Sequence, residues 1–358
     1  MKRTFFKKYL WLIIVVLIIS LSSVFYVTRV HKKSIQKPGQ GGAYTLIVEP
    51  EDGRRSILES INEARTEIDL TIYSLSDEEI EAALKSAHQR GVTVKILYNS
   101  NFYSHSSGQS HDYKKEDEVR KEMASLEEAG ILTKAASSAF RMTHQKTFTF
   151  DNSKSIIMSL NLDSDYFERV RDFAVITTNP REVAEITQVF NADWNYSPIT
   201  PSVESLVWSN VNSRAKILNL IRGATKTIEI YNEELEDREC LDALIAEAGS
   251  GVAVRVISAQ LGDTQETDGN RAQREYLNGH GVSAKYMPTA DYLYCHAKMI
   301  MVDYGTSNAK AFIGSENLSS TSLDENRELG IILNDKEIIE RLHDVFEADW
   351  SRCEFDQN

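Results

Sequence analysis

A short motif, His-x-Lys-x4-Asp, occurs twice in this 358-residue chain, and this repetition restricts its possible folds more than any other part of the sequence. A single His-x-Lys pair arises by chance in many proteins. Here each copy is followed by Ser-x-Asn and, eleven residues after that asparagine, by a carboxylate. The two sets are His144, Lys146, Asp151, Ser159, Asn161 and Asp172, and His296, Lys298, Asp303, Ser315, Asn317 and Glu328. Repetition of the whole set indicates a duplicated unit.

The duplication extends beyond the motifs. Four residues of the first half recur 160 positions later, and the offset becomes 152 at the histidines and 156 at the asparagines. These four pairs are Ala64/Ala224, Ile68/Ile228, Asp77/Asp237 and Gly91/Gly251. Both halves also end in Val-Phe-x-Ala-Asp-Trp, at 189–194 and 345–350. An internal duplication with insertions in loops explains this pattern, and we expect two domains, residues 44–200 and 201–358.

From Tyr44 onward, helical and strand patterns alternate, which predicts an α/β fold. In the first half a helix near 54–64 precedes a strand at 68–73. A second helix, which begins at Asp77 and ends near Arg90, precedes a strand at 92–98. Asp77 suits a helix N-cap and Gly91 lies where the helix should end.

The residue types of the motif suit phosphodiester chemistry. Alternation along a strand places the His and Lys of each motif on one face, and a hairpin returns Ser-x-Asn to their side. One neutral imidazole can then attack phosphorus while the other, protonated, gives its proton to the leaving oxygen. The two histidines must therefore hold different protonation states at the working pH, and we expect them to titrate as a coupled pair. A carboxylate can hold each imidazole Nδ1–H, and the lysines and asparagines stabilise negative charge without a metal or other cofactor.

These residues resemble the signature of the phospholipase D superfamily, which is His-x-Lys-x4-Asp followed by Gly/Ser-Ser-x-Asn and an acidic residue. The resemblance covers roughly residues 44–358. It implies two tandem α/β sandwich domains that meet at a pseudo-twofold axis and place both motifs in one cleft.

The resemblance also implies roles for individual residues. His144 would be the nucleophile that forms a phosphohistidine, and His296 would be the general acid. The residues that would bind phosphate are Lys146, Lys298, Asn161 and Asn317, with Ser159 and Ser315 as supporting donors. The carboxylates that would orient the histidines are Asp172 and Glu328. The motif aspartates Asp151 and Asp303 would fix the hairpins and would not contact substrate.

The first copy departs from the family pattern more than the second. It has Met158, Val170 and Asp172 where the second has Gly314, Asn326 and Glu328. Because neither copy lacks its His, Lys or Asn, we expect both to take part in catalysis. The alternative is a duplicated scaffold that has lost activity.

The N-terminal region predicts a membrane anchor. A basic start at residues 1–9 precedes an almost unbroken apolar run at 10–28, which is just long enough to span a bilayer, and residues 29–43 form a linker. A cleaved secretory signal is the alternative. Each flank of the run carries four Lys or Arg, so the positive-inside rule indicates no orientation.

The charge of the remaining chain argues against a general nucleic-acid binder. The first 43 residues contain eight of the 40 Lys and Arg and none of the 53 Asp and Glu, which leaves 32 bases against 53 acids, or −21. Such a field repels phosphate polymers unless a local basic groove exists. Candidate groove residues are Lys114–Lys115, Arg120–Lys121 and 271–274, but each group is mixed with acids and is more typical of a solvated helix face.

Other candidate site residues carry weaker signals. His105 and His111 lie in a Ser-rich stretch at 101–113, which predicts a solvated loop, with a flexible lid or a metal pair as alternatives. The three cysteines, Cys240, Cys295 and Cys353, lack metal-ligand spacing and predict neither a disulfide framework nor a zinc site. Cys295 adjoins His296 but has no implied base, so we expect a partly buried strand residue.

Together these features predict a membrane-anchored phosphodiesterase of the phospholipase D type that hydrolyses or transfers phospholipid head groups. The anchor and the acidic body favour a lipid over a nucleic acid. Three alternatives remain: a cardiolipin synthase-like phosphatidyltransferase, a membrane-tethered endonuclease and an inactive lipid-binding scaffold. Cardiolipin synthases typically have two membrane segments, and only one is visible here. The sequence does not indicate the head group, the acceptor, the side of the membrane or the oligomeric state.

Overall fold

The computed structural model describes residues 42–102, 113–262, 264 and 266–356. Ala43–Asn358 form one compact unit, and the description below concerns that unit. The expected anchor at 10–28, the basic start, nearly all of the linker, and His105 and His111 lie outside the described residues. None of the helices within these described ranges has the length and apolar character needed to cross a membrane.

The first repeat runs from strand β1 to helix α5. Its elements are β1 (Tyr44–Glu49), α2 (Arg55–Glu63), β2 (Glu67–Ile72), α3 (Glu78–Gln89), β3 (Thr93–Tyr98), α4 (Tyr113–Glu128), β4 (Leu132–Ala135), β5 (Thr147–Phe150), β6 (Lys154–Met158), the short 3-10 helix η1 (Ser164–Phe167), β7 (Val170–Thr177) and α5 (Pro180–Trp194). The expected helices and strands between residues 54 and 98 are confirmed to within about two residues, the usual uncertainty of an element boundary.

The second repeat runs from strand β8 to helix α10. Its elements are β8 (Leu206–Trp208), α6 (Ser213–Arg222), β9 (Thr227–Asn232), α7 (Arg238–Gly249), β10 (Ala253–Ala259), α8 (Arg271–Asn278), β11 (Ser283–Met287), β12 (Tyr294–Cys295), β13 (Met299–Val302), β14 (Lys310–Gly314), α9 (Ser320–Asp324), β15 (Leu329–Leu333) and α10 (Lys336–Trp350).

The two repeats share one sheet topology, which confirms the internal duplication and the α/β class. The first sheet has the order β1-β7-β6-β5-β2-β3-β4, and the second has β8-β15-β14-β13-β9-β10-β11. Strand β2 pairs in parallel with β3, and β9 pairs in parallel with β10. The hairpins that follow the two motifs, β5–β6 and β13–β14, are antiparallel, and their first strands pair antiparallel with β2 and β9. Asp77 and Asp237 cap equivalent helices by accepting from the backbone N–H of Ile80 and Cys240.

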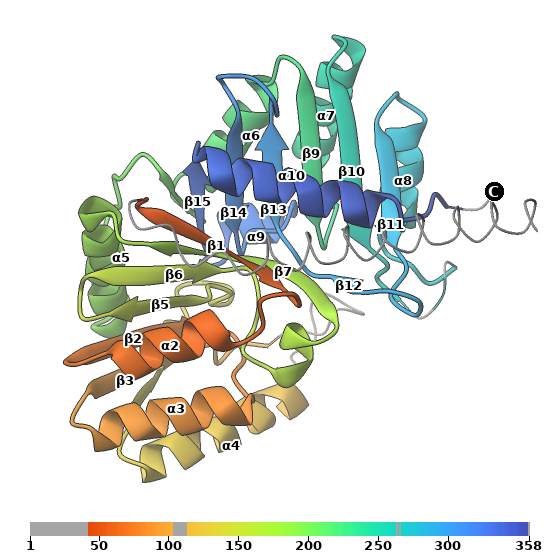
Figure 1. Cartoon of the computed structure of the whole chain (residues 1–358). Coiled ribbons are helices and arrows are strands. Elements are labelled where there is room, and N and C mark those ends of the chain that lie inside the picture. The colour runs from red at the N-terminus through yellow and green to blue at the C-terminus, as the bar shows by residue number, and fades with distance from the viewer. Residues whose placement is uncertain (1–41, 103–112, 263, 265, 357–358) are drawn as a thin grey trace, which may run out of the picture. The chain divides into compact units, whose positions relative to one another are not determined.

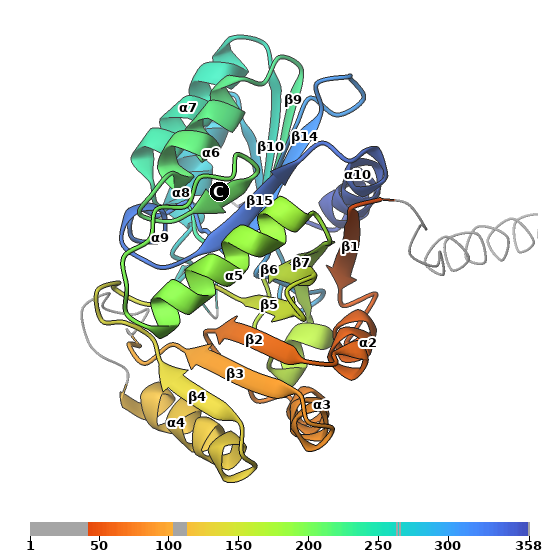
Figure 2. The ribbon, with the colours of Figure 1, turned by 90° about the vertical axis from the view of Figure 1, so that its left-hand side faces the viewer.

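Three hydrophobic cores lie in layers across the unit. One fills the space between the first sheet and α2 and α3, and another fills the space between the second sheet and α6 and α7. The third core combines residues of both repeats, including Ile186 of α5 and Phe346 of α10. Figure 1 shows α10 across the front of the second sheet with α6 and α7 behind it, and Figure 2 shows α5 between the two sheets. The repeats therefore share a buried interface.

The chain also crosses between the sheets. Strand β12 belongs to the second repeat by sequence, yet it pairs in parallel with the start of β7 in the first sheet, through Cys295 and Arg171. In the first repeat, Thr143 makes the equivalent bridge to Arg327 beside the second sheet. Each crossing segment leads directly into a His-x-Lys motif.

Candidate active site

Both His-x-Lys segments lie where the chain passes from the sheet of one repeat to the sheet of the other. His296 and Lys298 fall between β12, which pairs with the first sheet, and β13 of the second sheet. The expectation that the motif lies within a strand is therefore wrong, because its residues connect two sheets. Backbone hydrogen bonds fix the crossings: His144 N–H donates to Arg327 O at 3.0 Å, and His296 N–H donates to Arg171 O at 3.2 Å.

Each imidazole bonds to the carboxylate of the opposite repeat. His144 Nδ1 lies 2.8 Å from Glu328 Oε2, and His296 Nδ1 lies 2.9 Å from Asp172 Oδ2. Both carboxylates are fully buried, and the histidines are 9% and 3% exposed. With Nδ1–H directed at a carboxylate, each Nε2 is the nitrogen that remains for chemistry. Each imidazole therefore depends on the opposite repeat for its carboxylate partner.

The two lysines are fully buried and equivalent in placement. Lys146 Nζ donates to the carbonyl of His144 at 2.8 Å, and Lys298 Nζ donates to the carbonyl of His296 at 2.5 Å. The Asn161 amide donates to Tyr166 OH within the first repeat, and the Tyr166 ring packs edge-on against His296 of the second repeat. The structure therefore brings the predicted His, Lys, Asn and orienting carboxylates into one cluster.

The two motif serines lie behind the carboxylates. Ser159 Oγ donates to Asp172 Oδ1 at 2.5 Å, and Ser315 Oγ accepts from the backbone N–H of Leu329 at 3.2 Å. Both serines are fully buried. These contacts are consistent with the expected role of supporting donors, and a direct contact of either hydroxyl group with phosphate stays a prediction. Glu328 has different supports, since Ser322 and Asn326 donate to its Oε1.

The motif aspartates lie at the far ends of the hairpins. Asp151 accepts from the backbone N–H groups of Arg65, Thr66 and Glu67, and Asp303 accepts from those of Thr225 and Lys226. Both aspartates have positive φ angles, 50° and 55°, as tight turns require. These contacts agree with the expectation that they fix the hairpins.

Burial and neighbouring charges shift the pKa values in the cluster. Burial, reinforced by Lys146, lowers the pKa of His144 to about 4, despite the opposing influence of Glu328. Burial and the nearby Lys298 lower the pKa of Lys146 to about 7. Burial alone would raise the pKa of Glu328, but His144 brings it below its usual value. At neutral pH the cluster thus contains a neutral His144 beside an ionised Glu328.

Sequence reasoning missed two residues that line the cluster. Tyr73 and Glu233 occupy equivalent positions, 160 residues apart, directly after β2 and β9. The Tyr73 ring packs edge-on against His144, and Glu233 Oε2 lies 2.8 Å from Lys298 Nζ. The 160-residue offset between the repeats could have indicated that these two positions are equivalent. Because one is a tyrosine and the other a glutamate, a search for identical residues in the two repeats did not find them.

Sequence reasoning also missed a pair of buried arginines. Arg171 and Arg327 immediately precede the orienting carboxylates, and each forms a two-bond ion pair with the helix-terminal aspartate of the opposite repeat. Arg171 binds Asp349 at 2.7 and 3.1 Å, and Arg327 binds Asp193 at 2.8 and 2.7 Å. The repeated Val-Phe-x-Ala-Asp-Trp ending therefore supplies the aspartates that join the two halves.

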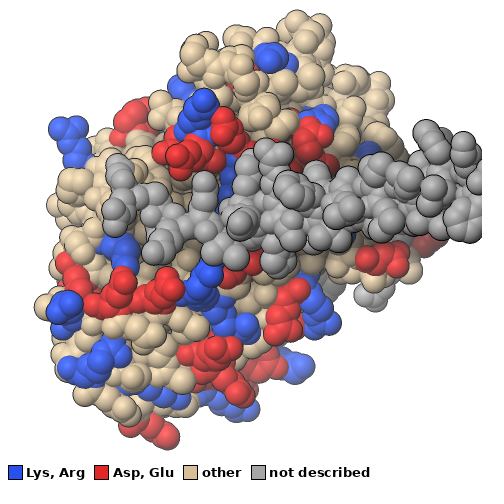
Figure 3. Space-filling model, viewed as in Figure 1, with Lys and Arg blue, Asp and Glu red and all other residues tan. Residues whose placement is uncertain are grey.

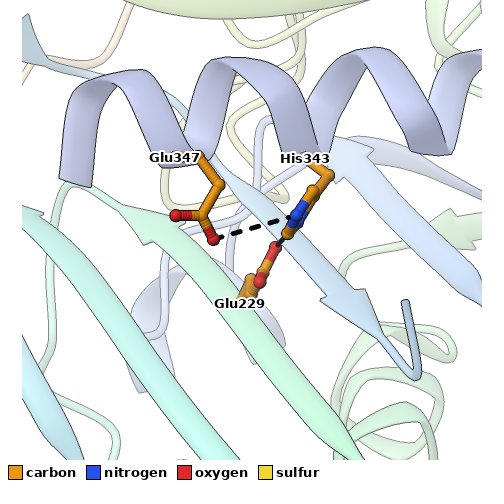
Figure 4. A group of neighbouring side chains, drawn as sticks. All are labelled: Glu229, His343 and Glu347. Atoms are coloured by element: carbon orange, nitrogen blue, oxygen red, sulfur yellow. Dashed lines mark hydrogen bonds and ion pairs between the residues drawn. The ribbon is translucent and has the colours of Figure 1, made fainter. Parts of the chain in front are cut away.

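The remaining candidate residues do not belong to the cluster. Cys295 is fully buried with its pKa raised well above the usual value by burial, as expected for a strand residue. Outside the site, Glu229, His343 and Glu347 each have one potential metal-ligating atom within 4.8 Å of those of the other two (Figure 4). Arg255 pairs with both of these carboxylates, so a guanidinium group already balances their charge.

Comparison with known proteins places both halves in one family. Residues 57–194 and 217–350 each match the family model described as cardiolipin synthase, PLD-like domain. The chain is 21% identical over 345 residues to a cardiolipin synthase of Listeria innocua, an alignment that covers 87% of this chain and 69% of that protein.

Two further similarities are more limited. The chain is 26% identical over 141 residues to the mitochondrial cardiolipin hydrolase of Danio rerio, and the alignment covers 39% of this chain and 56% of that relative. A solved phosphatidylserine synthase of Haemophilus influenzae superimposes with a TM-score of 0.65 at 13% identity and 87% coverage of both chains, which is a likeness of fold.

Proposed function

This chain belongs to the phospholipase D superfamily, among the cardiolipin synthase-type phospholipase D-like domains, and from this membership we propose that it is a phosphodiesterase that hydrolyses or transfers phospholipid head groups through a phosphohistidine. The observation that carries the proposal is the pair of crossed imidazole–carboxylate bonds, His144 to Glu328 and His296 to Asp172. They hold two imidazoles of one cluster with Nε2 as the reactive nitrogen.

His144 is proposed as the nucleophile because its lowered pKa keeps the imidazole neutral. Its Nε2 attacks phosphorus, the bond from phosphorus to the head-group oxygen breaks, and His296 Nε2 supplies the proton that this oxygen takes. Water or an alcohol then attacks the phosphohistidine and gives its proton to His296, which restores both imidazoles. Lys146 and Lys298 are the cations that would stabilise the charge on phosphate oxygens.

A pH profile follows from the two lowered pKa values. His144 acts without its proton, so kcat/KM should rise through about pH 4, well below the range of an ordinary histidine. Lys146 acts with its proton, so kcat/KM should fall above about pH 7. Lys146→Arg retains its charge at high pH and should shift only the alkaline limb upward. The measurement is kcat/KM against pH with a p-nitrophenyl phosphodiester, because its leaving group needs no proton from His296 and the alkaline limb then reports Lys146. An alkaline limb that stays in place in Lys146→Arg would contradict the assignment.

The nuclease alternative has little support in the charges of the described surface. Figure 3 shows Lys and Arg mixed with Asp and Glu on the face it presents. Among the candidate groove residues, Lys114 pairs with Glu118 and Arg120 pairs with Asp117. Arg274 is fully buried between Asp268 and Asp356, which corrects the expectation of a solvated face at that residue.

Transfer to an alcohol is a second candidate because the reacting groups are shielded from water. His144 and His296 are 9% and 3% exposed, and Lys146 and Lys298 are fully buried. A site that excludes water favours an alcohol acceptor over hydrolysis. A cardiolipin synthase-like reaction, in which the acceptor is the hydroxyl group of a second lipid, is consistent with the relative from Listeria innocua.

The experiment that tests the proposal assays the detergent-solubilised full chain on vesicles of phosphatidylglycerol, phosphatidylethanolamine and phosphatidylcholine, with single-stranded DNA in parallel. His296→Ala serves as the blank. Phosphatidic acid indicates hydrolysis, and cardiolipin or an exchanged head group after addition of an alcohol indicates transfer. DNA cleavage without a lipid product would establish the nuclease alternative, and inactivity on both substrates would favour the scaffold.

A further inference from the structure

Glu233 occupies the position in the second repeat where a phosphate group would be expected. Its Oε2 lies 2.8 Å from Lys298 Nζ, 3.4 Å from Asn317 Nδ2 and 3.5 Å from His296 Nε2. These atoms are the cation, the amide donor and the reactive nitrogen of the second motif. A carboxylate oxygen in contact with all three occupies the same place as a non-bridging phosphate oxygen would.

The first repeat has no such carboxylate. Tyr73 stands at the equivalent position, with its ring 5.3 Å from Lys146 Nζ and edge-on to His144. Within the residues that the structure describes, Lys146 has no carboxylate within ion-pair distance, whereas Lys298 has Glu233 at 2.8 Å. The two halves of the cluster therefore differ in charge, although their motifs are the same.

The contacts of Glu233 keep it ionised and hold it in place. Burial alone would raise its pKa, but His296 and Lys298 bring the pKa well below the usual value. Tyr294 OH donates to the other carboxylate oxygen, Oε1, at 2.7 Å and so fixes the side chain in this orientation. Glu233 is only 8% exposed, in the connection between β9 and α7.

We propose that Glu233 is an internal anion that fills the phosphate position of the second repeat, so that a phosphate ester contacts both lysines only after this carboxylate turns away. The inference rests on the proposed function only for the chemical class of the ligand, a phosphate ester anion. While Glu233 contacts Lys298, its carboxylate balances the charge of that lysine, and Lys146 is the cation available to the phosphate. Glu233 thereby determines how strongly the site binds anions, and Tyr294 holds it closed.

Calorimetric titration of the detergent-solubilised full chain tests this inference without turnover. The probes are inorganic phosphate, as a free anion, and a short-chain phosphatidylglycerol below its micelle concentration, as a phosphodiester. Glu233→Gln keeps the shape of the side chain and removes its charge, so it should bind one or both probes about tenfold more tightly than the unaltered chain, or about 1.4 kcal/mol. Tyr294→Phe should show a smaller gain in the same direction.

Glu236→Gln is the matched control, because Glu236 is exposed on the same connection and the substitution changes charge equally. Its affinity for both probes should stay unchanged. Failure of Glu233→Gln to bind either probe more tightly, or an equal gain in Glu236→Gln, would overturn the inference. A gain in affinity cannot arise from damage to the fold.

The proposed function can fail separately. If Glu233→Gln binds phosphate more tightly and the unaltered chain turns over no phospholipid, the internal anion is supported and the proposed lipid reaction is excluded. Phospholipid turnover with no change in anion affinity would do the reverse.

Discussion

His144→Ala is expected to reduce kcat on a phospholipid by about a thousandfold or more, and His296→Ala by a comparable factor. The first substitution removes the nitrogen that would attack phosphorus. The second removes the proton donor for an alkoxide leaving group, which is a poor leaving group without protonation. The measurement is initial-rate release of the head group by each purified full-length variant.

The choice of leaving group separates the two histidine roles. A phosphodiester with a p-nitrophenyl group expels a stable anion that needs no proton, so the first step should survive in His296→Ala and not in His144→Ala. Because His296 also accepts the proton of the incoming water, His296→Ala should release one equivalent of nitrophenolate per protein and then stall. A burst from His144→Ala instead would exchange the two assignments.

Two matched substitutions test whether these losses come from the reacting groups. Cys295→Ala alters the residue next to His296, a fully buried thiol that donates to Ile257 O at 3.9 Å, and should leave kcat nearly unchanged. His280→Ala removes an exposed histidine outside the cluster and should do the same. Retention of most activity by either active-site variant would remove the two-histidine mechanism.

The fold could be predicted from the sequence because its signals are local. Asp77 and Gly91 mark the two ends of one helix, and their equivalents Asp237 and Gly251 mark another. Gly91 and Gly251 have φ angles of 92° and 95°, where glycine is favoured. Such features depend on neighbours within one turn of the chain, and a duplication shows each of them twice.

The pairing across the interface could not be predicted in the same way. The family resemblance implied that Asp172 and Glu328 orient the histidines, but nothing in their spacing indicates which histidine each one contacts. That answer depends on the crossing of Thr143 and Cys295 to the opposite sheet, a long-range arrangement without a local signal. Partners within one repeat and partners in opposite repeats would leave the same spacing in the sequence.

The difference between Met158 and Gly314 has a packing explanation. A Cβ atom at Gly314 would lie 2.5 Å from Glu316 Oε2 and 2.5 Å from the Cα of Gly330. Glu316 is fully buried, and burial raises its pKa well above the usual value. The second repeat therefore has its own packing at this position, which accommodates a glycine and not a larger residue.

Arg171→Met is expected to lower the free energy of unfolding by about 3 to 5 kcal/mol, because it leaves a buried carboxylate without its cation. Arg171 is 1% exposed and binds fully buried Asp349, which also accepts from Tyr231 OH and Tyr292 OH. The backbone carbonyl of Arg171 holds His296 N–H, so kcat should also fall at temperatures well below unfolding. Urea denaturation and head-group release measure the two effects.

Arg169→Met is the matched control. Arg169 lies only two residues before Arg171 in the chain, and it makes an exposed ion pair with Asp165. Exposed pairs contribute little to stability, so this variant should unfold like the unaltered protein. Asp349→Asn combined with Arg171→Met removes the uncompensated charge and should recover part of the lost stability. Equal urea midpoints for Arg171→Met and Arg169→Met would show that the cross-repeat ion pair does not hold the halves together. A fall in both stability and kcat confined to Arg171→Met would connect the repeated Ala-Asp-Trp ending to the placement of the opposite histidine.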